Sequence, residues 1–337
     1  MLRRLSLSKW IETHGRPIDG MLLTGPRNSC VEGRYPDSLR GRVVMRRDFD
    51  RCLLEQAIAA GAQFEDRVVV RGPVVEPCHG ERGVHVRGVL VRSARRADSP
   101  LPAKVTIAAD GRRSTLAFAL GLATHPDRPR RWAIGAYFEG VSGTSSFGEM
   151  HVRAGEYLGI APLAGGLTNA CFVGSRATLA HMRNPERTLR AAIERDVQLR
   201  ERFAGAHIVA PPAVLGPLAV DVRTAGVAGL LLAGDAAGFV DPITGDGLRF
   251  ALRGGELAAE TALQMLQTGN PDGHITLARR RREAFAWKWR LNRTLRRIVD
   301  SPVALSAGVA AASVAPAIIR LLIAVAGDCH STAVEQC

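Results

Sequence analysis

The sequence lacks the cysteine and histidine patterns that hold small or metal-dependent folds together. Its six cysteines are scattered through 337 residues, with no Cys-x-x-Cys pair and no histidine at metal-ligand spacing. We therefore expect reduced thiols and no metal, and neither a disulfide framework nor a zinc site is supported. The opening residues Met1-Leu2-Arg3-Arg4 are not followed by the apolar segment that is typical of a secretory signal peptide. These features predict a cytoplasmic protein.

Lysine is scarce, although the chain is strongly basic. There are 45 lysines and arginines against 32 acidic residues, for a net charge of +13, yet only Lys9, Lys104 and Lys288 are lysines. A skew toward arginine along the whole chain is typical of genomic base composition rather than of a surface built for polyanions. Because no nucleic-acid module accompanies the charge, we predict no nucleic-acid partner.

Internal repeats and low-complexity tracts are also missing, and 46% of the residues are apolar, which excludes a disordered chain. Helices and short strands alternate at first, a block of strands follows, and long helices close the chain, whereas residues 16–41 are interpreted as loop. This order predicts an α/β domain with an inserted antiparallel sheet. Helices are expected at 1–15, 48–60, 112–121, 185–204, 247–268 and 273–299, and strands at 63–70, 84–91, 104–109, 132–141, 149–152, 157–162, 167–173, 214–220 and 230–233.

One run with chemical potential is Ala108-Ala109-Asp110-Gly111-Arg112-Arg113-Ser114. A strand ends in small residues, Asp110-Gly111 makes a turn, and a helix begins with free N–H groups that suit a phosphate or a ribose hydroxyl. By itself this run is more typical of an ordinary turn, with Ser114 as a helix cap.

The second run, residues 230–248, is more specific. Leu230-Leu231-Leu232-Ala233 is apolar throughout, which predicts a strand buried on both faces, as in a parallel sheet. It delivers Asp235 to the carboxyl end of that strand, where open α/β sheets bind ligands. Pro242 and two glycines then shape a loop before a helix that begins near Gly247, whose free N–H groups and dipole favour negative charge on a ligand ring.

Together with Arg46-Arg47-Asp48-Phe49-Asp50, these runs resemble the FAD-dependent family that holds geranylgeranyl reductases and single-component flavoprotein hydroxylases. The similarity extends in the expected order from about the amino terminus to Leu266. It implies a Rossmann-like, glutathione-reductase-type FAD-binding domain that is interrupted by an antiparallel substrate sheet.

The resemblance also implies a set of cofactor contacts. Arg46 would contact the FAD phosphates, Val70 the adenine region, and Asp235 the ribityl chain or the ribose. Main-chain contacts at the flavin ring would come from Gly247 and Leu248. The two paired motifs complete the predicted cofactor set, which comprises Arg46, Val70, Asp110, Gly234, Asp235, Gly247 and Leu248.

One departure from the family is the missing Gly-x-Gly-x-x-Gly between an opening strand and helix. The nearest fragment, Gly245-Asp246-Gly247-Leu248-Arg249-Phe250, lies elsewhere and lacks the last glycine. Such glycines bring the backbone to the pyrophosphate of the cofactor. We therefore expect a domain that is incomplete at its amino terminus. Either the start lies further upstream, which we favour, or the chain is a truncated relative with impaired cofactor binding.

A second departure concerns the substrate. Prenyl reductases of this family carry Tyr-x-Trp-x-Phe-Pro on the inserted sheet, whereas this chain has Tyr157-Leu158-Gly159-Ile160-Ala161-Pro162. The match makes Tyr157 and Pro162 candidate substrate residues. Gly159 and Ala161 would widen the cavity for a bulkier apolar substrate. Equally, Tyr157 fits an ordinary strand residue.

Residues 279–326 combine a basic helix with an apolar tail. Interleaved tryptophans and arginines predict peripheral contact with an anionic membrane, at the inner face of the bilayer. The alternative is a pair of helices packed on the domain with an arginine-rich solvent face. A spanning helix is not expected, because Pro316 and Arg320 interrupt the tail.

We therefore predict an FAD-dependent oxidoreductase that acts on an apolar lipid, isoprenoid or polyketide substrate. The alternatives are an aromatic monooxygenase that uses NAD(P)H and oxygen, and a flavin-free remnant with a binding or membrane role. No catalytic acid or base is nominated, because the flavin carries the redox step. The predicted domains are an FAD-binding part at 1–125, the substrate sheet at 126–220, the rest of the FAD-binding domain at 221–270 and helices at 271–337.

Overall fold

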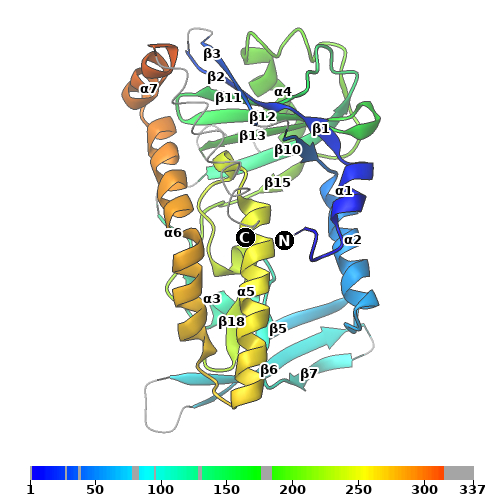
Figure 1. The fold of residues 1–337 in the computed structure, drawn as a ribbon, viewed down its shortest axis with the longest axis vertical. Coiled ribbons are helices and arrows are strands. Elements are labelled where there is room, and N and C mark those ends of the chain that lie inside the picture. The colour runs from blue at the N-terminus through cyan, green and yellow to red at the C-terminus, as the bar shows by residue number, and fades with distance from the viewer. Residues whose placement is uncertain are drawn as a thin grey trace. The chain divides into compact units, whose positions relative to one another are not determined.

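The computed structural model describes residues 2–26, 29–36, 39–77, 83–94, 96–127, 131–175 and 184–314 (Figure 1). These residues form two compact units, and each is described by itself. The first unit comprises the described residues within 1–62, 129–216 and 294–314, and the second those within 63–128 and 217–293. The predicted domains instead group residues 1–62 with 63–125.

The first unit is built on an eight-stranded sheet that is almost wholly antiparallel. Its strands follow the order β14-β10-β13-β12-β11-β2-β3, and β15 also pairs with β10. Among these pairs only β11 and β2 run parallel. The predicted antiparallel sheet is therefore confirmed. Its strands are β2 (Gly20–Thr24), β3 (Cys30–Arg34), β10 (Arg131–Glu139), β11 (Phe147–Arg153), β12 (Glu156–Pro162), β13 (Thr168–Ser175), β14 (His207–Ile208) and β15 (Ala213–Leu215).

Residues 16–41, interpreted as loop from the sequence, contribute to four strands, so that interpretation is wrong. β1 (Arg16–Ile18) pairs with β4 (Gly41–Val43), and β2 pairs with β3 at the edge of the large sheet. Each strand is too short to show a hydrophobic period. In addition, β2 finds its parallel partner β11 far along the chain, with Gly20 opposite Phe147.

The hydrophobic core of the first unit covers one face of this sheet. The core includes Ile134 of β10, Leu158 of β12 and Phe172 of β13. These side chains belong to the same hydrophobic cluster as residues of α4 (Pro185–Arg195). The sequence predicts a helix up to residue 204, but α4 ends at Arg195 because Asp196 adopts an extended conformation. The other helices of this unit are α1 (Ser8–His14) and α2 (Arg46–Ala59), and α7 (Pro302–Val314) also lies in it.

The second unit contains two three-stranded sheets and a short ribbon. One sheet has the order β17-β18-β8, with β18 and β8 parallel, and the other has the order β5-β6-β7. Their strands are β5 (Val68–Pro77), β6 (Val84–Ser93), β7 (Arg96–Pro102), β8 (Thr106–Ala108), β17 (Gly226–Val227) and β18 (Leu230–Leu232), and the ribbon pairs β9 (Ala123–Thr124) with β16 (Asp221–Val222).

The strand β18 is buried on both faces, as its apolar sequence predicts. Leu230 and Leu232 contribute to a cluster that includes residues of α3 (Thr115–Ala119), whereas Leu231 contributes to a cluster with α5 (Gly247–Thr268) and α6 (Gly273–Asp300). In Figure 1 the helices α5 and α6 run beside each other. They end within a residue of their predicted boundaries.

None of the described helices is long and apolar enough to cross a membrane. The predicted apolar tail begins with α7, and its residues 315–326 lie outside the described residues.

Candidate functional site

The two motif runs lie next to each other in the second unit. Leu232 of β18 is opposite Ala108 of β8 in a parallel pair, and the N–H of Ala233 donates to the carbonyl of Ala108 at 2.9 Å. Asp110 and Asp235 therefore follow the carboxyl ends of neighbouring parallel strands, where ligands of open α/β sheets bind. The structure thus brings these two predicted residues to one edge of the sheet.

Asp110 has a structural task at this edge. Its carboxylate accepts a hydrogen bond of 2.8 Å from the N–H of Thr115, and Ser114 Oγ accepts one of 3.1 Å from the N–H of Ala117. Both side chains cap the first turn of α3, and Gly111 adopts the positive φ of +80° that the turn requires. These contacts match the ordinary-turn interpretation, and the role of Asp110 toward a cofactor stays a prediction.

Asp235 sits in an electrostatic pair rather than in a cap. It follows Gly234, whose φ is +58°, and no side-chain bond caps this short helical turn, η3 (Gly234–Ala237). Burial lowers the pKa of the Arg112 guanidinium, and the charge of Asp235 opposes that shift. Arg112 Nε is buried and has no hydrogen-bond partner among the described residues. The two motifs thus bring a carboxylate and a guanidinium within electrostatic reach of each other.

The loop from Ala237, the last residue of η3, to Asp246 leaves the start of α5 open to close approach. It contains the helical turn η4 (Pro242–Thr244) and Gly245, which has a φ of +71°. A Cβ added at Gly245 would meet no atom within 4 Å, and one added at Gly247 would meet only Phe239, at 3.8 Å. The first N–H groups of an α-helix have no intrahelical partner and carry the positive end of its dipole. This bare backbone suits an electron-rich ring.

Three buried side chains of α6, which sequence reasoning missed, contact this loop. Lys288 Nζ donates to Asp246 Oδ1 at 2.9 Å, and a guanidinium nitrogen of Arg281 donates to the carbonyl of Ala237 at 2.8 Å. Asn292 Nδ2 donates to the carbonyl of Asp241 at 2.7 Å and to Thr244 Oγ1 at 2.8 Å. The available signal was their helical spacing, which places them on the face of Leu277 and Phe285.

The arginine-rich solvent face predicted for this helix therefore needs a correction at two positions. Arg281 and Lys288 are only 5% and 0% exposed. Burial also lowers the pKa of Arg281 to about 10. These two cations face the interior because their partners are the carboxylate and carbonyl groups of the loop.

The remaining predicted residues are spread over both units. Val70 lies in the second unit and packs, half-buried, against the cluster that contains Leu230. Arg46 belongs to the first unit, where it is exposed and pairs with both carboxylate oxygens of Asp50 at 3.1 Å. Tyr157 and Pro162 also belong to the first unit and are buried on β12. The Arg131 guanidinium lies 5.8 Å from the centre of the Tyr157 ring.

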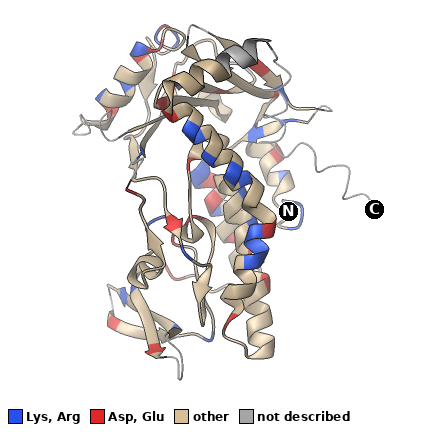
Figure 2. Ribbon diagram, turned by 90° about the vertical axis from the view of Figure 1, so that its left-hand side faces the viewer, with Lys and Arg blue, Asp and Glu red and all other residues tan. Residues whose placement is uncertain are grey.

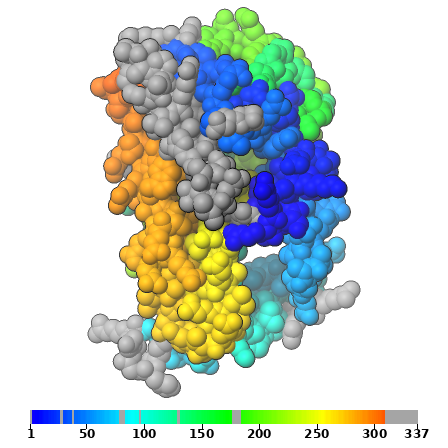
Figure 3. All heavy atoms as spheres, viewed as in Figure 1, coloured from blue at the N-terminus to red at the C-terminus, as the bar shows by residue number. Residues whose placement is uncertain are grey.

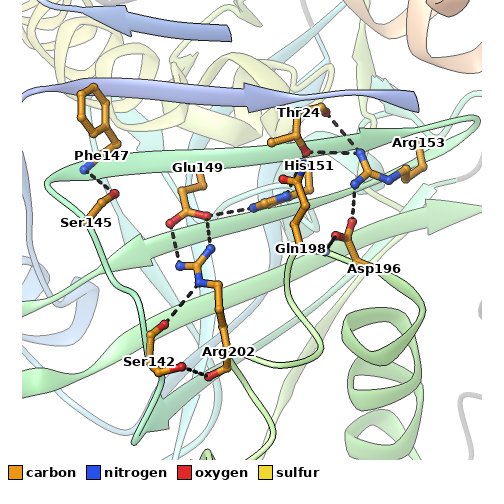
Figure 4. Close-up of polar contacts among 10 residues, drawn as sticks. All are labelled: Thr24, Ser142, Ser145, Phe147, Glu149, His151, Arg153, Asp196, Gln198 and Arg202. Atoms are coloured by element: carbon orange, nitrogen blue, oxygen red, sulfur yellow. Dashed lines mark hydrogen bonds and ion pairs between the residues drawn. The ribbon is translucent and has the colours of Figure 1, made fainter. Parts of the chain in front are cut away.

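The first unit has its own buried polar cluster, shown in Figure 4. The ring of His151 is bonded at both nitrogens, to Glu149 Oε2 and to Thr24 Oγ1, at 2.9 Å each. Arg202 donates two bonds to Glu149, of 2.7 and 2.8 Å, and Arg153 donates to an oxygen of Asp196 at 2.6 Å. Since its members bond one another, this cluster ties β2, β11 and the segment after α4 together.

A cavity of about 170 Å³ adjoins the cluster. Its apolar lining includes Leu158, Phe172 and Ala192, and its ionic lining consists of pairs whose charges cancel, Arg153 with Asp196 and Arg195 with Glu156. The one described cysteine on the neighbouring β13, Cys171, has its pKa raised to about 11 by burial, so its thiol is neutral and a poor nucleophile. Neither feature provides a reactive group.

The second unit therefore holds the better candidate site. Asp235 and Arg112 would hold the ribityl or ribose hydroxyls of FAD, and the bare backbone at Gly247 and Leu248 would face its ring. The residues present fit this end of the cofactor, because a Cβ would find free space at Gly245 and Gly247, and the buried Arg112 Nε has no hydrogen-bond partner among the described residues.

Comparisons with known proteins show the family, the fold and the cofactor. A family described as "FAD binding domain" matches residues 2–291. Digeranylgeranylglycerophospholipid reductase 2 of Methanothermobacter thermautotrophicus is 29% identical over 83% of this chain and 69% of its own length. The protein of the same name from Methanopyrus kandleri is 28% identical over 77% of this chain, and the match spans 63% of its length.

Solved structures show the same fold. The geranylgeranyl bacteriochlorophyll reductase-like protein of Thermoplasma acidophilum superimposes with a TM-score of 0.71 at 20% identity, over 91% of this chain and 82% of its own. The flavin-dependent brominase Bmp2 gives a TM-score of 0.77 at 18% identity, over 96% of this chain and 81% of its own. The predicted fold class and the predicted cofactor, FAD, are therefore confirmed. The chain belongs to the FAD binding domain family, as an FAD-dependent oxidoreductase.

Proposed function

We propose that this chain reduces carbon–carbon double bonds of an apolar, isoprenoid lipid, in the manner of a geranylgeranyl reductase. The observation that carries the proposal is the edge of β8 and β18, where Asp235, Arg112 and the bare start of α5 come together. The names of the similar reductases supply the substrate class. When bound, FAD would supply the hydride that such a reduction requires.

The chain's own residues would bind and orient. Asp235 would accept hydrogen bonds from hydroxyls of the cofactor, and Arg112 would keep that carboxylate ionised. The N–H groups at the start of α5 would stabilise negative charge on the ring. The apolar clusters on both faces of β18 would exclude water from this edge.

The sheet of the first unit supports a wide apolar substrate. Leu158 and Ile160 of β12 face the core, so Gly159 and Ala161 lie on the opposite face. A Cβ at Gly159 or at Gly135 would make only ordinary van der Waals contact, at 3.9 Å, so both positions present small residues on this face. Tyr157 packs against Arg131, so it has a structural role in this sheet. A contact between Tyr157 and a substrate stays a proposal.

The test compares two chemistries on the flavin-loaded protein. Anaerobic saturation of a geranylgeranyl lipid with dithionite as reductant is the expected result. Oxygen consumption that is coupled to NAD(P)H oxidation and to hydroxylation of an aromatic or polyketide substrate would instead show that the protein is a monooxygenase. A colourless protein that takes up no added FAD would support the flavin-free remnant instead.

We also propose peripheral membrane contact through the outer face of α6. Four arginines lie on one side of this helix and are exposed, namely Arg279, Arg290, Arg293 and Arg297, which we term the outer arginines. Figure 2 shows basic residues along the ribbon of this helix, and Figure 3 shows its atoms in orange at the left of the view. Trp287 is 44% exposed on the same helix. Such a face favours anionic lipid headgroups.

A further inference from the structure

The inner face of α6 carries polar side chains where apolar ones would pack equally well. Leu277 and Phe285 are fully buried in the cluster that covers β18. Arg281, Lys288 and Asn292 share this face and are 5%, 0% and 2% exposed. Removing a lysine from water is costly, and a methionine of similar volume would avoid that cost. Their presence points to a task other than core packing.

The contacts of these three side chains are distributed along one loop. Arg281 reaches the carbonyl of Ala237 at the beginning of the loop, and Asn292 reaches Asp241 and Thr244 in its middle. Lys288 reaches Asp246 at its end, by an ion pair of 2.9 Å in which both side chains are almost fully buried. One rigid helix therefore fixes the loop at its start, its middle and its end.

The last of these contacts adjoins the bare backbone directly. Asp246 precedes Gly247, and its carbonyl accepts the hydrogen bond of 3.0 Å from Phe250 that opens α5. The Lys288 ammonium thus determines where the residue before Gly247 lies and, through it, the direction of the first N–H groups of the helix. The aromatic rings of Phe250, Phe285 and Trp289 pack at 5.1–6.3 Å from one another and brace α5 against α6.

We propose that Lys288 is a positioning residue for the flavin ring. Acting through Asp246, and together with Arg281 and Asn292, it holds the loop in the conformation that presents the N–H groups of Gly247 and Leu248 to the ring. This inference rests on the proposed function, because it assigns the loop to the flavin. The helix α6 would then have two roles: its inner face would hold the loop, and its outer face would contact the membrane. Variants on each face test the two roles separately.

The test uses the full chain and three variants. Lys288→Met removes the charge at nearly constant volume, and Lys288→Met/Asp246→Asn also removes the carboxylate that the single variant leaves buried without its ammonium partner. Arg282→Met, an exposed position on the same helix, is the matched control. Two measurements test the loop: hydrogen–deuterium exchange of residues 237–248 without FAD, and FAD affinity by quenching of flavin fluorescence. The melting temperature of each variant measures its stability.

We expect exchange in 237–248 to accelerate about tenfold or more in both Lys288 variants, with FAD bound about tenfold more weakly, as is typical when a buried charge contact is lost. The double variant should regain most of the melting temperature that the single variant loses, while both loop effects persist. The control should match the wild type in both measurements.

The inference is overturned if the double variant keeps the exchange rates and the FAD affinity of the wild type. In that case the pair serves only the stability of the second unit. A wild-type chain that binds no FAD would defeat the proposed function instead. The exchange measurement, made without FAD, would still decide whether Lys288 holds the loop.

Discussion

Arg202 donates two hydrogen bonds to the carboxylate of Glu149, which is 3% exposed, and thereby places an ion pair inside the first unit. Burial opposes the ionisation of Glu149, but hydrogen bonds from His151 and Arg202 outweigh it and lower the pKa of this carboxyl. The stabilisation is therefore present above the pKa of the unfolded chain, at about 4.3, and is lost as the pH falls through the lower pKa of the folded protein.

Replacing Glu149 should therefore change the stability of the protein by an amount that depends on pH. Glu149→Gln should lower the free energy of unfolding by about 3 kcal/mol near neutral pH, because the Arg202 charge loses its partner. As the pH falls below about 4.3 the difference from the wild type should shrink, because the carboxyl of the unfolded chain then takes up a proton that the folded protein binds only at lower pH. Urea unfolding at several pH values measures both quantities. Glu156→Gln, in the looser pair with Arg195 at 3.5 Å, should change stability by less than about 1 kcal/mol. A Glu149→Gln effect that does not vary with pH would contradict this account.

The carboxylate of Asp235 should matter for the cofactor more than for the fold. If Asp235 binds FAD as proposed, Asp235→Ala removes a charge-assisted hydrogen bond worth about 1.5–3 kcal/mol, so the dissociation constant should rise about tenfold to a hundredfold. Flavin fluorescence titration measures this change, and Asp235→Asn should restore part of the affinity. An unchanged affinity in Asp235→Ala would remove the role assigned to this side chain.

Gly247 offers a test of close backbone approach. The Cβ of a valine there would lie 3.8 Å from Phe239, which is ordinary van der Waals contact, so we expect Gly247→Val to fold with a melting temperature near that of the wild type. It should nevertheless weaken FAD binding about tenfold or more, because its methyl groups occupy the space over the helix start. Calorimetry and fluorescence titration separate the two effects. Equal FAD affinity in the variant would show that the ring does not approach this backbone.

The outer arginines should govern attachment to anionic lipid. Each arginine near such a surface contributes about 1 kcal/mol, so Arg290→Glu/Arg293→Glu should reduce binding to phosphatidylserine vesicles about tenfold or more. Co-sedimentation with the vesicles measures the bound fraction, and vesicles of phosphatidylcholine alone are the control. Lys288→Met should bind vesicles like the wild type, because that side chain is buried. If the double variant bound phosphatidylserine vesicles as strongly as the wild type does, this face would be excluded as a docking surface.

The elements that carry the motifs were predictable because their signals are local. The apolar run Leu230–Leu232 forms the doubly buried strand that its composition predicts, and α5 extends over the predicted residues up to the helix-ending Gly269. Ser114 caps α3 as its position after the Asp-Gly turn indicates. In each case the deciding residues lie within one turn or one strand of the element.

Interactions between distant segments were not predictable in the same way. The sequence of α6 shows a basic helix, and only its packing reveals that Lys288 turns inward to Asp246 while Arg290 stays at the surface. Likewise, nothing near Thr24 indicates that its hydroxyl meets the ring of His151.

The amino-acid sequence alone thus determined the strands and turns that deliver Asp110 and Asp235, since hydrophobic period, glycine conformation and capping depend on neighbouring residues. The tertiary structure decided which charges are buried, which short strands pair and which helix holds the loop before Gly247. Those outcomes depend on desolvation and on partners far away in the chain. The sequence does not show whether a charged side chain faces water or a buried carboxylate.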